Sequence, residues 1–293
     1  MLRHLNAGFE APSRVVVLGA AGFVGSTLIK RLGADGIPYL ALTRHDVDLL
    51  APDAADRLAA LCQPDDVFVA AAAMAPCKNA QMLLDNMNLA VAVVTALKKS
   101  PVAHVINISS DAVYADSPRP LTEESPRAPD TLHGIMHLAR EIMFAGELGQ
   151  PLVNLRPSLL YGAGDPHNGY GPNRFRRLAN AGETIVLFGE GEERRDHVHI
   201  DDVATIIAQV IGWRSVGSLN IATGKVASFK EIAEKVVALA PRKVAVKSSP
   251  RIGPMPHNGY RPFDNSLTTQ AFPEFSYESL EVGLAKAQAE ATG

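Results

Sequence analysis

The chain has 293 residues, of which 47% are hydrophobic and 20% are charged, and its formal net charge is −3 at pH 7. This composition is typical of an ordinary globular protein and excludes a fibrous or largely disordered chain. Because there is no long basic run, the charge gives no reason to expect binding to nucleic acid or to an anionic membrane.

The first residues, MLRHLNAGFEAPSR, lack the apolar core of a signal peptide and predict a flexible leader. No apolar run in the sequence approaches the roughly 18 residues of a membrane helix. Cys62 and Cys77 do not form a CxxC pair, which argues against a disulfide framework or a cysteine-rich zinc site. We therefore expect a cytoplasmic protein.

The first half of the chain alternates between apolar runs and helical patterns. Residues 14–18 lead through GAAGFVG into an amphipathic segment that ends at glycine, which predicts a strand, a tight turn and a helix. Further strands are predicted at residues 38–42, 66–71, 104–109 and 152–156. Such alternation is typical of right-handed βαβ units, so we predict an α/β fold with a doubly wound parallel sheet buried on both faces.

The pattern changes after Pro157, where the loop YGAGDPHNGYGPN is followed by a short helix and by strands at TIVLFG and HVHI. This segment predicts an inserted, smaller lobe. Residues 201–213 then predict a helix, SLNIAT predicts a strand that returns to the main sheet, and the C-terminal segment predicts two more helices.

Three glycines, Gly19, Gly22 and Gly25, form G-x-x-G-x-x-G where the first strand meets the first helix. Small residues at this turn let the backbone approach a pyrophosphate, and the helix N-terminus stabilises its charge. We therefore predict a dinucleotide site here, which also includes Ala21, Phe23 and Val24.

The end of the second strand, LALTRHDVDL, bears on the choice of cofactor. Sites that prefer NAD tend to place a carboxylate here, whereas the Arg44 guanidinium suits the 2′-phosphate of NADP. We expect NADP in preference to NAD, and a solvated surface arginine next to Asp46 is the alternative. Asp48 and Leu49 are expected to flank the adenine.

Five segments in order, GAAGFVG, ISSDAVYAD, PLTEESPRAPDTLHG, LRPSLLYG and RRDHVHIDDVA, resemble the extended short-chain dehydrogenase/reductase family. Its members include UDP-galactose epimerases, dTDP-glucose dehydratases and dTDP-4-dehydrorhamnose reductases. The resemblance implies a Rossmann-like dinucleotide-binding lobe, assigned to residues 13–157 and 196–224, and a smaller C-terminal substrate lobe, assigned to residues 158–195 and 225–293. It also implies further cofactor contacts from Ala71, Ala72, Asn88, Ser109 and Pro157.

The resemblance places the reacting sugar oxygen next to Ser110, the residue that binds the hydroxyl being oxidised or reduced in the family. Strand-end capping by Ser109 and Ser110 is the alternative. Asp111 matches the acid of the dehydratases, but Ala112 replaces their Glu, which argues against a standard dehydratase.

The family's YxxxK motif falls on HGIMHLARE, where His133 replaces the tyrosine and His137 replaces the lysine. Gly134 and Glu141 match residues that commonly flank the motif and fix this alignment. A neutral imidazole accepts a proton near physiological pH, so His133 can act as a base. His137, one helical turn away, can hold the cofactor ribose or the tautomer of His133.

Two other interpretations of the histidine pair remain open. Loss of redox chemistry would leave a protein that only binds the dinucleotide and a nucleotide sugar. A metal site is possible because histidines at i and i+4 can share one ion, although no third ligand accompanies them, so we predict no metal.

Arg195 and Arg261 match positions that hold the two phosphates of a nucleotide sugar in related enzymes, a role that suits guanidinium geometry. Arg195 can instead pair with Asp196 or Asp201. Asn173 and Phe188 are expected to line the nucleotide pocket, with core packing as the alternative for Phe188.

The resemblance further implies a homodimer formed through helices that include the one beginning near His133. Met136, Ile142, Met143 and Phe144 are the candidates for that interface or for the monomer core. We predict an NAD(P)-dependent nucleotide-sugar epimerase or keto-sugar reductase, and the alternative is a catalytically inactive nucleotide-binding protein of the same ancestry.

Overall fold

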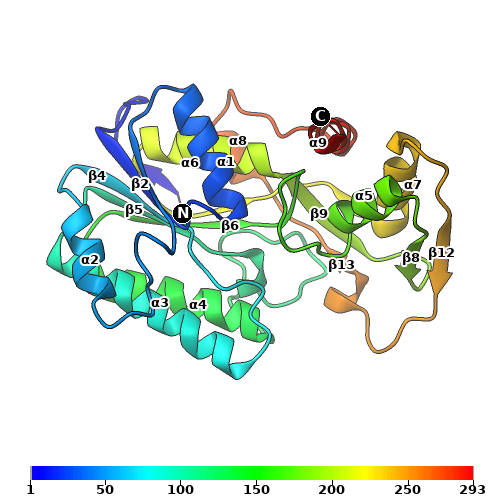
Figure 1. Ribbon diagram of the computed structural model, residues 1–293, viewed down its shortest axis with the longest axis horizontal. Helices are drawn as coiled ribbons and strands as arrows, with labels where there is room; N and C mark the ends of the chain where they lie inside the picture. The colour runs from blue at the N-terminus through cyan, green and yellow to red at the C-terminus, as the bar shows by residue number, and fades with distance from the viewer. Residues whose placement is uncertain (1, 293) are drawn as a thin grey trace.

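The computed structural model describes residues 2–292, and within this range a seven-stranded sheet forms the larger lobe (Figure 1). Six strands are parallel, and β1 pairs antiparallel with β10. In spatial order the strands are β1 (Arg3–His4), β10 (Ser215–Ile221), β6 (Leu152–Pro157), β5 (His104–Ile108), β4 (Asp66–Ala70), β2 (Arg14–Leu18) and β3 (Tyr39–Leu42).

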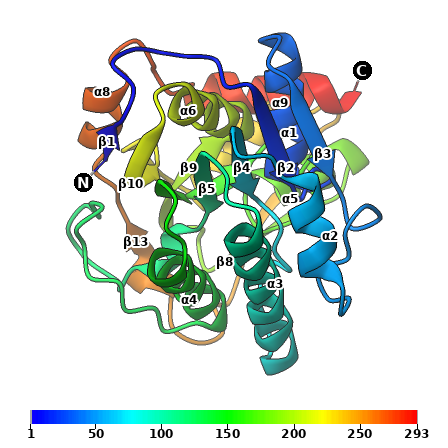
Figure 2. The same cartoon turned by 90° about the vertical axis from the view of Figure 1, so that its left-hand side faces the viewer.

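Helices cover both faces of this sheet (Figure 2). One face carries α1 (Phe23–Ala34) and α6 (Ile200–Gly212), and the other carries α2 (Ala54–Leu61), α3 (Ala80–Lys99) and α4 (Leu132–Glu147). The apolar strand runs are buried as predicted, with Val15, Val16 and Val17 fully inaccessible to solvent. The Rossmann-like, doubly wound parallel sheet is therefore confirmed.

The smaller lobe lies beside the carboxyl ends of the parallel strands (Figure 1). Its sheet joins β7 (Leu159–Tyr161), β9 (Arg194–His199), β11 (Val226–Ser228) and β13 (Tyr260–Arg261), and a separate pair joins β8 (Ile185–Phe188) to β12 (Val246–Ser249). The helices of this lobe are α5 (Pro172–Ala181), α7 (Phe229–Leu239) and α9 (Leu280–Thr292). Two short 3₁₀ turns complete the fold: η1 (Asp111–Val113) follows β5, and η2 (Pro256–Gly259) precedes β13.

The assignment of residues 225–293 to the smaller lobe needs a correction. Helix α8 (Ser266–Ala271) returns to the main sheet beside β10, and Phe272 is buried in the same core as Val15 and Leu219. The described part of the C-terminal segment thus has three α-helices rather than two. Burial of the apolar Phe272 side chain in the large lobe accounts for the return of the chain to that lobe.

The N-terminal residues are not a flexible leader. Strand β1 pairs with Val216 and Ser215 of β10, and the His4 ring bonds the Ser215 hydroxyl at 2.8 Å. The backbone N–H of Glu10 donates to the Gly212 carbonyl. The segment is ordered because it extends the sheet, a tertiary contact that its polar sequence does not indicate.

Helix α3 is long and apolar enough, by length and composition, to cross a membrane, which the sequence analysis did not anticipate. In this fold, several apolar residues of α3 belong to the core. Ala90, Val93, Val94 and Leu97 are buried against the sheet and neighbouring helices, so packing accounts for the composition of α3.

Candidate functional site

The glycine turn between β2 and α1 presents a bare stretch of backbone. Gly19 has φ of +93°, and a Cβ atom there would lie 2.6 Å from the Ala72 nitrogen. A Cβ on Gly25 would lie 2.2 Å from the Gly19 carbonyl oxygen. Gly22 caps α1 without a side chain, and no acidic residue occupies the first turn. This cradle fits the diphosphate of a dinucleotide.

A cavity of about 260 Å³ opens next to the turn. Its lining includes the predicted cofactor residues Gly19, Ala21, Gly22, Arg44, Asp48, Leu49, Ala71 and Ala72. The Arg44 side chain is 77% exposed and pairs with the Asp48 carboxylate at 3.2 Å. The structure therefore brings these residues together around one cavity beside the glycine turn, with the exposed Arg44 guanidinium at its edge. Phe23 and Val24 begin α1, and Phe23 is buried in the core.

Asn88 does not reach this cleft, because its side chain is exposed on α3. Asn86 is buried instead, accepts a hydrogen bond from the Met74 N–H at 2.8 Å and donates to the Met74 carbonyl. The sequence contains a signal that favours burial of Asn86, because it shares one helical face with the apolar residues Ala90, Val93 and Leu97. Asn86 thus fixes the loop that follows β4.

Ser109 is buried and donates a hydrogen bond to the Glu141 carboxylate at 2.6 Å. Glu141 also pairs with Arg156 at 2.7 Å, and both of these side chains are buried. Ser109 therefore belongs to a structural network beneath the site, not to the surface that a cofactor would contact. Pro157, the next residue, is likewise buried at the end of β6.

Ser110, Asp111 and His133 meet where α4 packs on η1. Ser110 caps η1 and accepts a hydrogen bond from the Ala112 N–H at 3.1 Å. Helix α4 comes so close that a Cβ on Gly134 would lie 2.1 Å from the Ala112 carbonyl oxygen. Only glycine allows this approach, which brings His133 next to the loop of Ser110.

The two histidines of α4 touch each other edge to face, with ring centroids 4.7 Å apart. The Cys77 N–H donates to Nδ1 of His133 at 3.4 Å. Burial lowers the pKa of His133, and the Asp111 carboxylate opposes this shift. Burial, and after it the charge of Arg140, lowers the pKa of His137 well below its ordinary value. Both rings are therefore neutral at physiological pH.

Arg140 is a buried cation that the sequence analysis missed. Its guanidinium donates to Asn107 Oδ1 at 2.7 Å and to the carbonyls of Ala70, Ala72 and Ile108. These acceptors lie at the carboxyl ends of β4 and β5, below the cleft. The available signal was its position, since Met136, Arg140 and Phe144 follow one another at i+4 on the buried face of α4.

Arg195 and Arg261 converge on Asp111 from the smaller lobe. Arg261 Nε donates to the Asp111 carboxylate at 3.0 Å, and the nearest Arg195 nitrogen lies 3.9 Å from the same oxygen. Arg261 also pairs with Asp116, which bonds the His257 ring. Neither Asp116 nor His257 was singled out from the sequence. Asp111 thus joins the predicted substrate residues to the predicted catalytic loop.

Asn173 and Phe188 lie in the smaller lobe with different exposure. The Asn173 side chain is buried and bonds the Gly162 N–H and the Leu160 carbonyl. Its amide is therefore engaged by the backbone near β7. Phe188 is 49% exposed and stacks on Tyr170, so it is not a core residue and remains accessible to a ligand.

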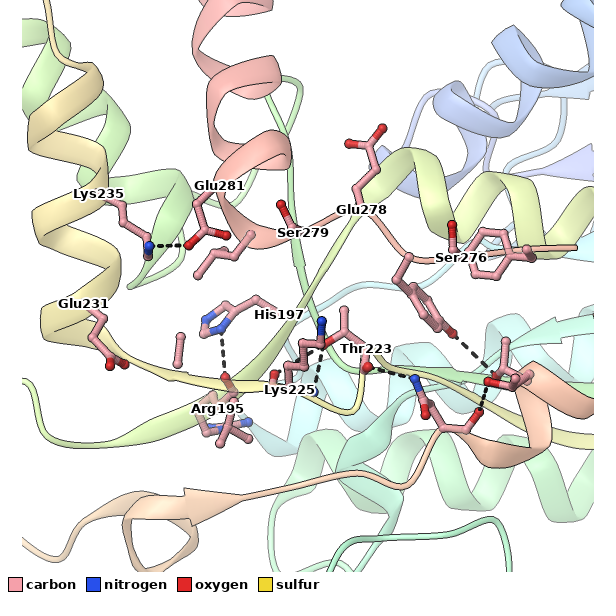
Figure 3. A pocket seen from close by; sticks show the side chains of 18 of the residues that line it. Arg195, His197, Thr223, Lys225, Glu231, Lys235, Ser276, Glu278, Ser279 and Glu281 are labelled. Atoms are coloured by element: carbon pink, nitrogen blue, oxygen red, sulfur yellow. Dashed lines mark hydrogen bonds and ion pairs between the residues drawn. The ribbon is translucent and has the colours of Figure 1, made fainter. Parts of the chain in front are cut away.

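A larger cavity of about 860 Å³ lies between α7, β11 and residues 275–281 (Figure 3). An ion pair between Lys235 and Glu281 joins α7 to α9 there. Among the predicted site residues that the structure describes, only Arg195 belongs to its lining. Since the glycine turn and His133 lie elsewhere, the candidate active site is not this cavity. Among residues 2–292, no group of three His, Cys, Asp or Glu side chains is placed to hold a metal ion.

The fold and the glycine turn define a Rossmann-type α/β protein with a second lobe across the carboxyl ends of its strands. The chain belongs to the NAD-dependent epimerase/dehydratase family, whose profile matches residues 15–222. It is 25% identical to a dTDP-4-dehydro-6-deoxy-D-allose reductase of Streptomyces bikiniensis, over 84% of this chain and 87% of the relative. The resemblance inferred from the sequence motifs is thereby confirmed.

The solved structures that share the fold include two with a bound dinucleotide. A UDP-glucose 4-epimerase of Thermus thermophilus in complex with NAD matches with a TM-score of 0.82 at 22% identity, over 96% of this chain and 99% of the other. A GDP-L-fucose synthetase of Naegleria fowleri bound to NADP matches with a TM-score of 0.79 at 17% identity, over 94% and 93% of the two chains.

Proposed function

We propose that the chain binds NAD(P) at the carboxyl ends of the main sheet and supports hydride transfer at a sugar carbon of a nucleotide sugar, as an epimerase or a keto-sugar reductase. One observation carries this proposal. The 3.0 Å contact between Arg261 and Asp111 joins a phosphate-binding type of side chain in one lobe to the loop of Ser110 in the other. A substrate held by both lobes would place its sugar beside Ser110 and His133.

Each group has a distinct role in this proposal. The glycine cradle and the α1 N-terminus hold the dinucleotide diphosphate, and the bound dinucleotide supplies or accepts the hydride. Ser110 and His133 contact the reacting oxygen, and His137 supports the ring of His133. Arg195 and Arg261 hold the substrate diphosphate. The exposed Arg44 at the adenosine cavity supports NADP over NAD.

A homodimer is part of the proposal. Leu84 and Val91 on α3 and Ile135 and Ile142 on α4 are exposed, and each pair is spaced seven residues apart. The two helices lie side by side (Figure 2), so these side chains suit a helical interface. Met136 and Phe144, in contrast, are fully buried in the monomer.

Binding without turnover is the second candidate function. It is favoured by the pairing of Arg261 with both Asp111 and Asp116, which satisfies the guanidinium before any phosphate arrives. A nucleotide sugar would have to compete with these two carboxylates.

A binding and turnover panel tests both candidates. We expect NADP⁺ to raise the melting temperature more than NAD⁺, and Arg44→Ser to weaken NADP⁺ binding about tenfold without changing NAD⁺ binding. Turnover is then scored with NADPH and a dTDP-4-dehydro-6-deoxy sugar, and by product analysis with UDP-glucose. Tight dinucleotide binding with no turnover of either sugar would favour the second candidate, and no dinucleotide binding would refute both.

A further inference from the structure

The Nδ1 atom of His133 accepts a hydrogen bond from a backbone N–H, a group that can only donate. This donor is the Cys77 N–H. Cys77 closes the loop after β4, which Asn86 fixes through both backbone groups of Met74. Because Nδ1 accepts this hydrogen bond, the proton of the neutral ring must sit on Nε2.

The surroundings keep the ring in this neutral form. An imidazolium would carry a second proton on Nδ1, directed against the Cys77 N–H. Asp111 on η1 favours that charge, whereas burial and His167 oppose it. On its own helix the ring contacts His137, which is neutral and whose pKa the Arg140 cation helps to lower. Burial lowers the pKa of Arg140 only to about 10, so its charge persists at physiological pH.

We propose that His133 acts through Nε2–H as a hydrogen-bond donor to the substrate oxygen and thereby selects a carbonyl, so that the chain is a keto-sugar reductase rather than an epimerase. This inference rests on the proposed function and narrows it. A base at this position would need the other tautomer, with the proton on Nδ1, which the Cys77 N–H opposes. This proposed donor role takes the place of the base role that the sequence predicts for His133.

A carbonyl oxygen suits this donor because it only accepts hydrogen bonds, and it becomes a better acceptor as negative charge develops. Neutral histidine is known to act in this electrophilic way in other enzymes. In the reduction, the carbonyl carbon gains a hydride from the bound reduced dinucleotide, and the carbonyl oxygen gains a proton from water to become a hydroxyl. Ser110 accepts a hydrogen bond from the Ala112 N–H, and its own hydroxyl donates to Asp111 Oδ1 at 3.3 Å. A substrate oxygen would therefore accept the hydrogen bond of the Ser110 hydroxyl in place of that carboxylate.

The tautomer can be read directly in the intact protein, with no turnover. In ¹⁵N-histidine-labelled protein we expect His133 to show a protonated Nε2 and an unprotonated Nδ1 from about pH 6 to about pH 8, with and without NADP⁺. The His133→Gln variant assigns the resonance. A protonated Nδ1, or titration near the ordinary pKa of about 6.5, would overturn the inference while leaving the proposed function standing.

A matched pair of variants separates a donor from a base. Gln keeps an N–H donor but cannot serve as a base, and Met keeps the bulk with neither property. The assay uses NADPH and a dTDP-4-dehydro-6-deoxy sugar. We expect His133→Met to lose about 10²- to 10³-fold in kcat, whereas His133→Gln should lose much less because it keeps a donor. Equal loss in both variants contradicts the donor role. Epimerisation of UDP-glucose by the wild type would exclude the selection of a carbonyl, and turnover of neither sugar would refute this selection together with the proposed function.

Discussion

Arg195 and Arg261 are register partners on the parallel strands β9 and β13, and both guanidinium groups reach the carboxylate of Asp111. Two like charges side by side on neighbouring strands repel each other, and a shared carboxylate reduces that repulsion. The two contacts are unequal, at 3.9 Å for Arg195 and 3.0 Å for Arg261. Arg195 also pairs with Glu193 at 3.3 Å, whereas Arg261 also pairs with Asp116. Because Arg195 is held less closely by Asp111, it is the arginine that we expect to turn toward a bound diphosphate.

Substituting each arginine should therefore have a different effect. We expect Arg195→Gln to weaken UDP binding by about ten- to a hundredfold in calorimetry, because a charged hydrogen bond is lost, with little change in melting temperature. Arg261→Gln should lower stability by about 3 kcal/mol, because Asp111 and Asp116 lose their buried partner. If Arg195→Gln binds UDP as tightly as the wild type, Arg195 does not hold the diphosphate.

The glycine turn predicts a sharp contrast between two glycine-to-alanine changes near α1. Gly19→Ala should reduce dinucleotide affinity more than about a hundredfold, because its Cβ collides with the Ala72 nitrogen in a left-handed conformation. Gly33→Ala is the control, since a Cβ there meets only a Tyr39 ring atom at 3.9 Å. That control should bind normally and be more stable by up to about 1 kcal/mol. Normal binding by the folded Gly19→Ala protein would argue against a diphosphate cradle.

Stability should depend on pH through Asp202, at the start of α6. Burial raises the pKa of Asp202 to about 6, from an ordinary value of 3.8, while its carboxylate accepts the Glu278 N–H. The folded state thus holds a proton that the unfolded state releases, so the stability from this group is complete below about pH 3.8 and is lost as pH rises through about 6.

Asp202→Asn removes the titration and keeps an acceptor for the Glu278 N–H. We expect its free energy of unfolding, relative to the wild type, to increase by about 1 kcal/mol between about pH 5 and about pH 8. Urea unfolding at both pH values measures this difference. A constant difference across that range would show that Asp202 does not titrate there.

The proposed dimer depends on the outer face of α3 and α4. Ile142→Glu should convert the dimer to a monomer in light scattering, because a charge in an apolar interface costs several kcal/mol. Val282→Glu on α9 is the matched control, since Val282 is 57% exposed and Ile142 is 59% exposed. A wild-type monomer, or an Ile142→Glu protein that remains a dimer, would exclude this interface.

The sequence predicted the main sheet well because its strands are short apolar runs flanked by turns, a local signal. Gly19 and Gly25 were predictable for the same reason, since their backbone requirements follow from one strand–turn–helix unit. Two of the cofactor residues that the resemblance implied are placed differently by the structure. The resemblance implied Asn88, whereas the buried asparagine of α3 is Asn86, and it implied a cofactor contact for Ser109, whose hydroxyl donates to Glu141.

Features set by contacts between distant segments could not be predicted. The Cys77 N–H meets His133 across 56 positions of sequence, and nothing local to either residue indicates it. The same holds for the shared carboxylate of Asp111, which lies 150 positions from Arg261. Both contacts depend on how the lobes and loops pack. In our proposal the contact with Cys77 decides which nitrogen of the His133 ring carries the proton.

The pairing of β1 with β10 also protects the sheet from unwanted association. An open edge strand is a template for another polypeptide, and β10 would otherwise end the sheet on this side. Beyond the two residues of β1, Glu123 accepts the Asn220 N–H and Thr268 donates to the Asn220 carbonyl. Removing residues 2–10 would therefore uncover part of this border, with aggregation rather than lost catalysis as the first symptom.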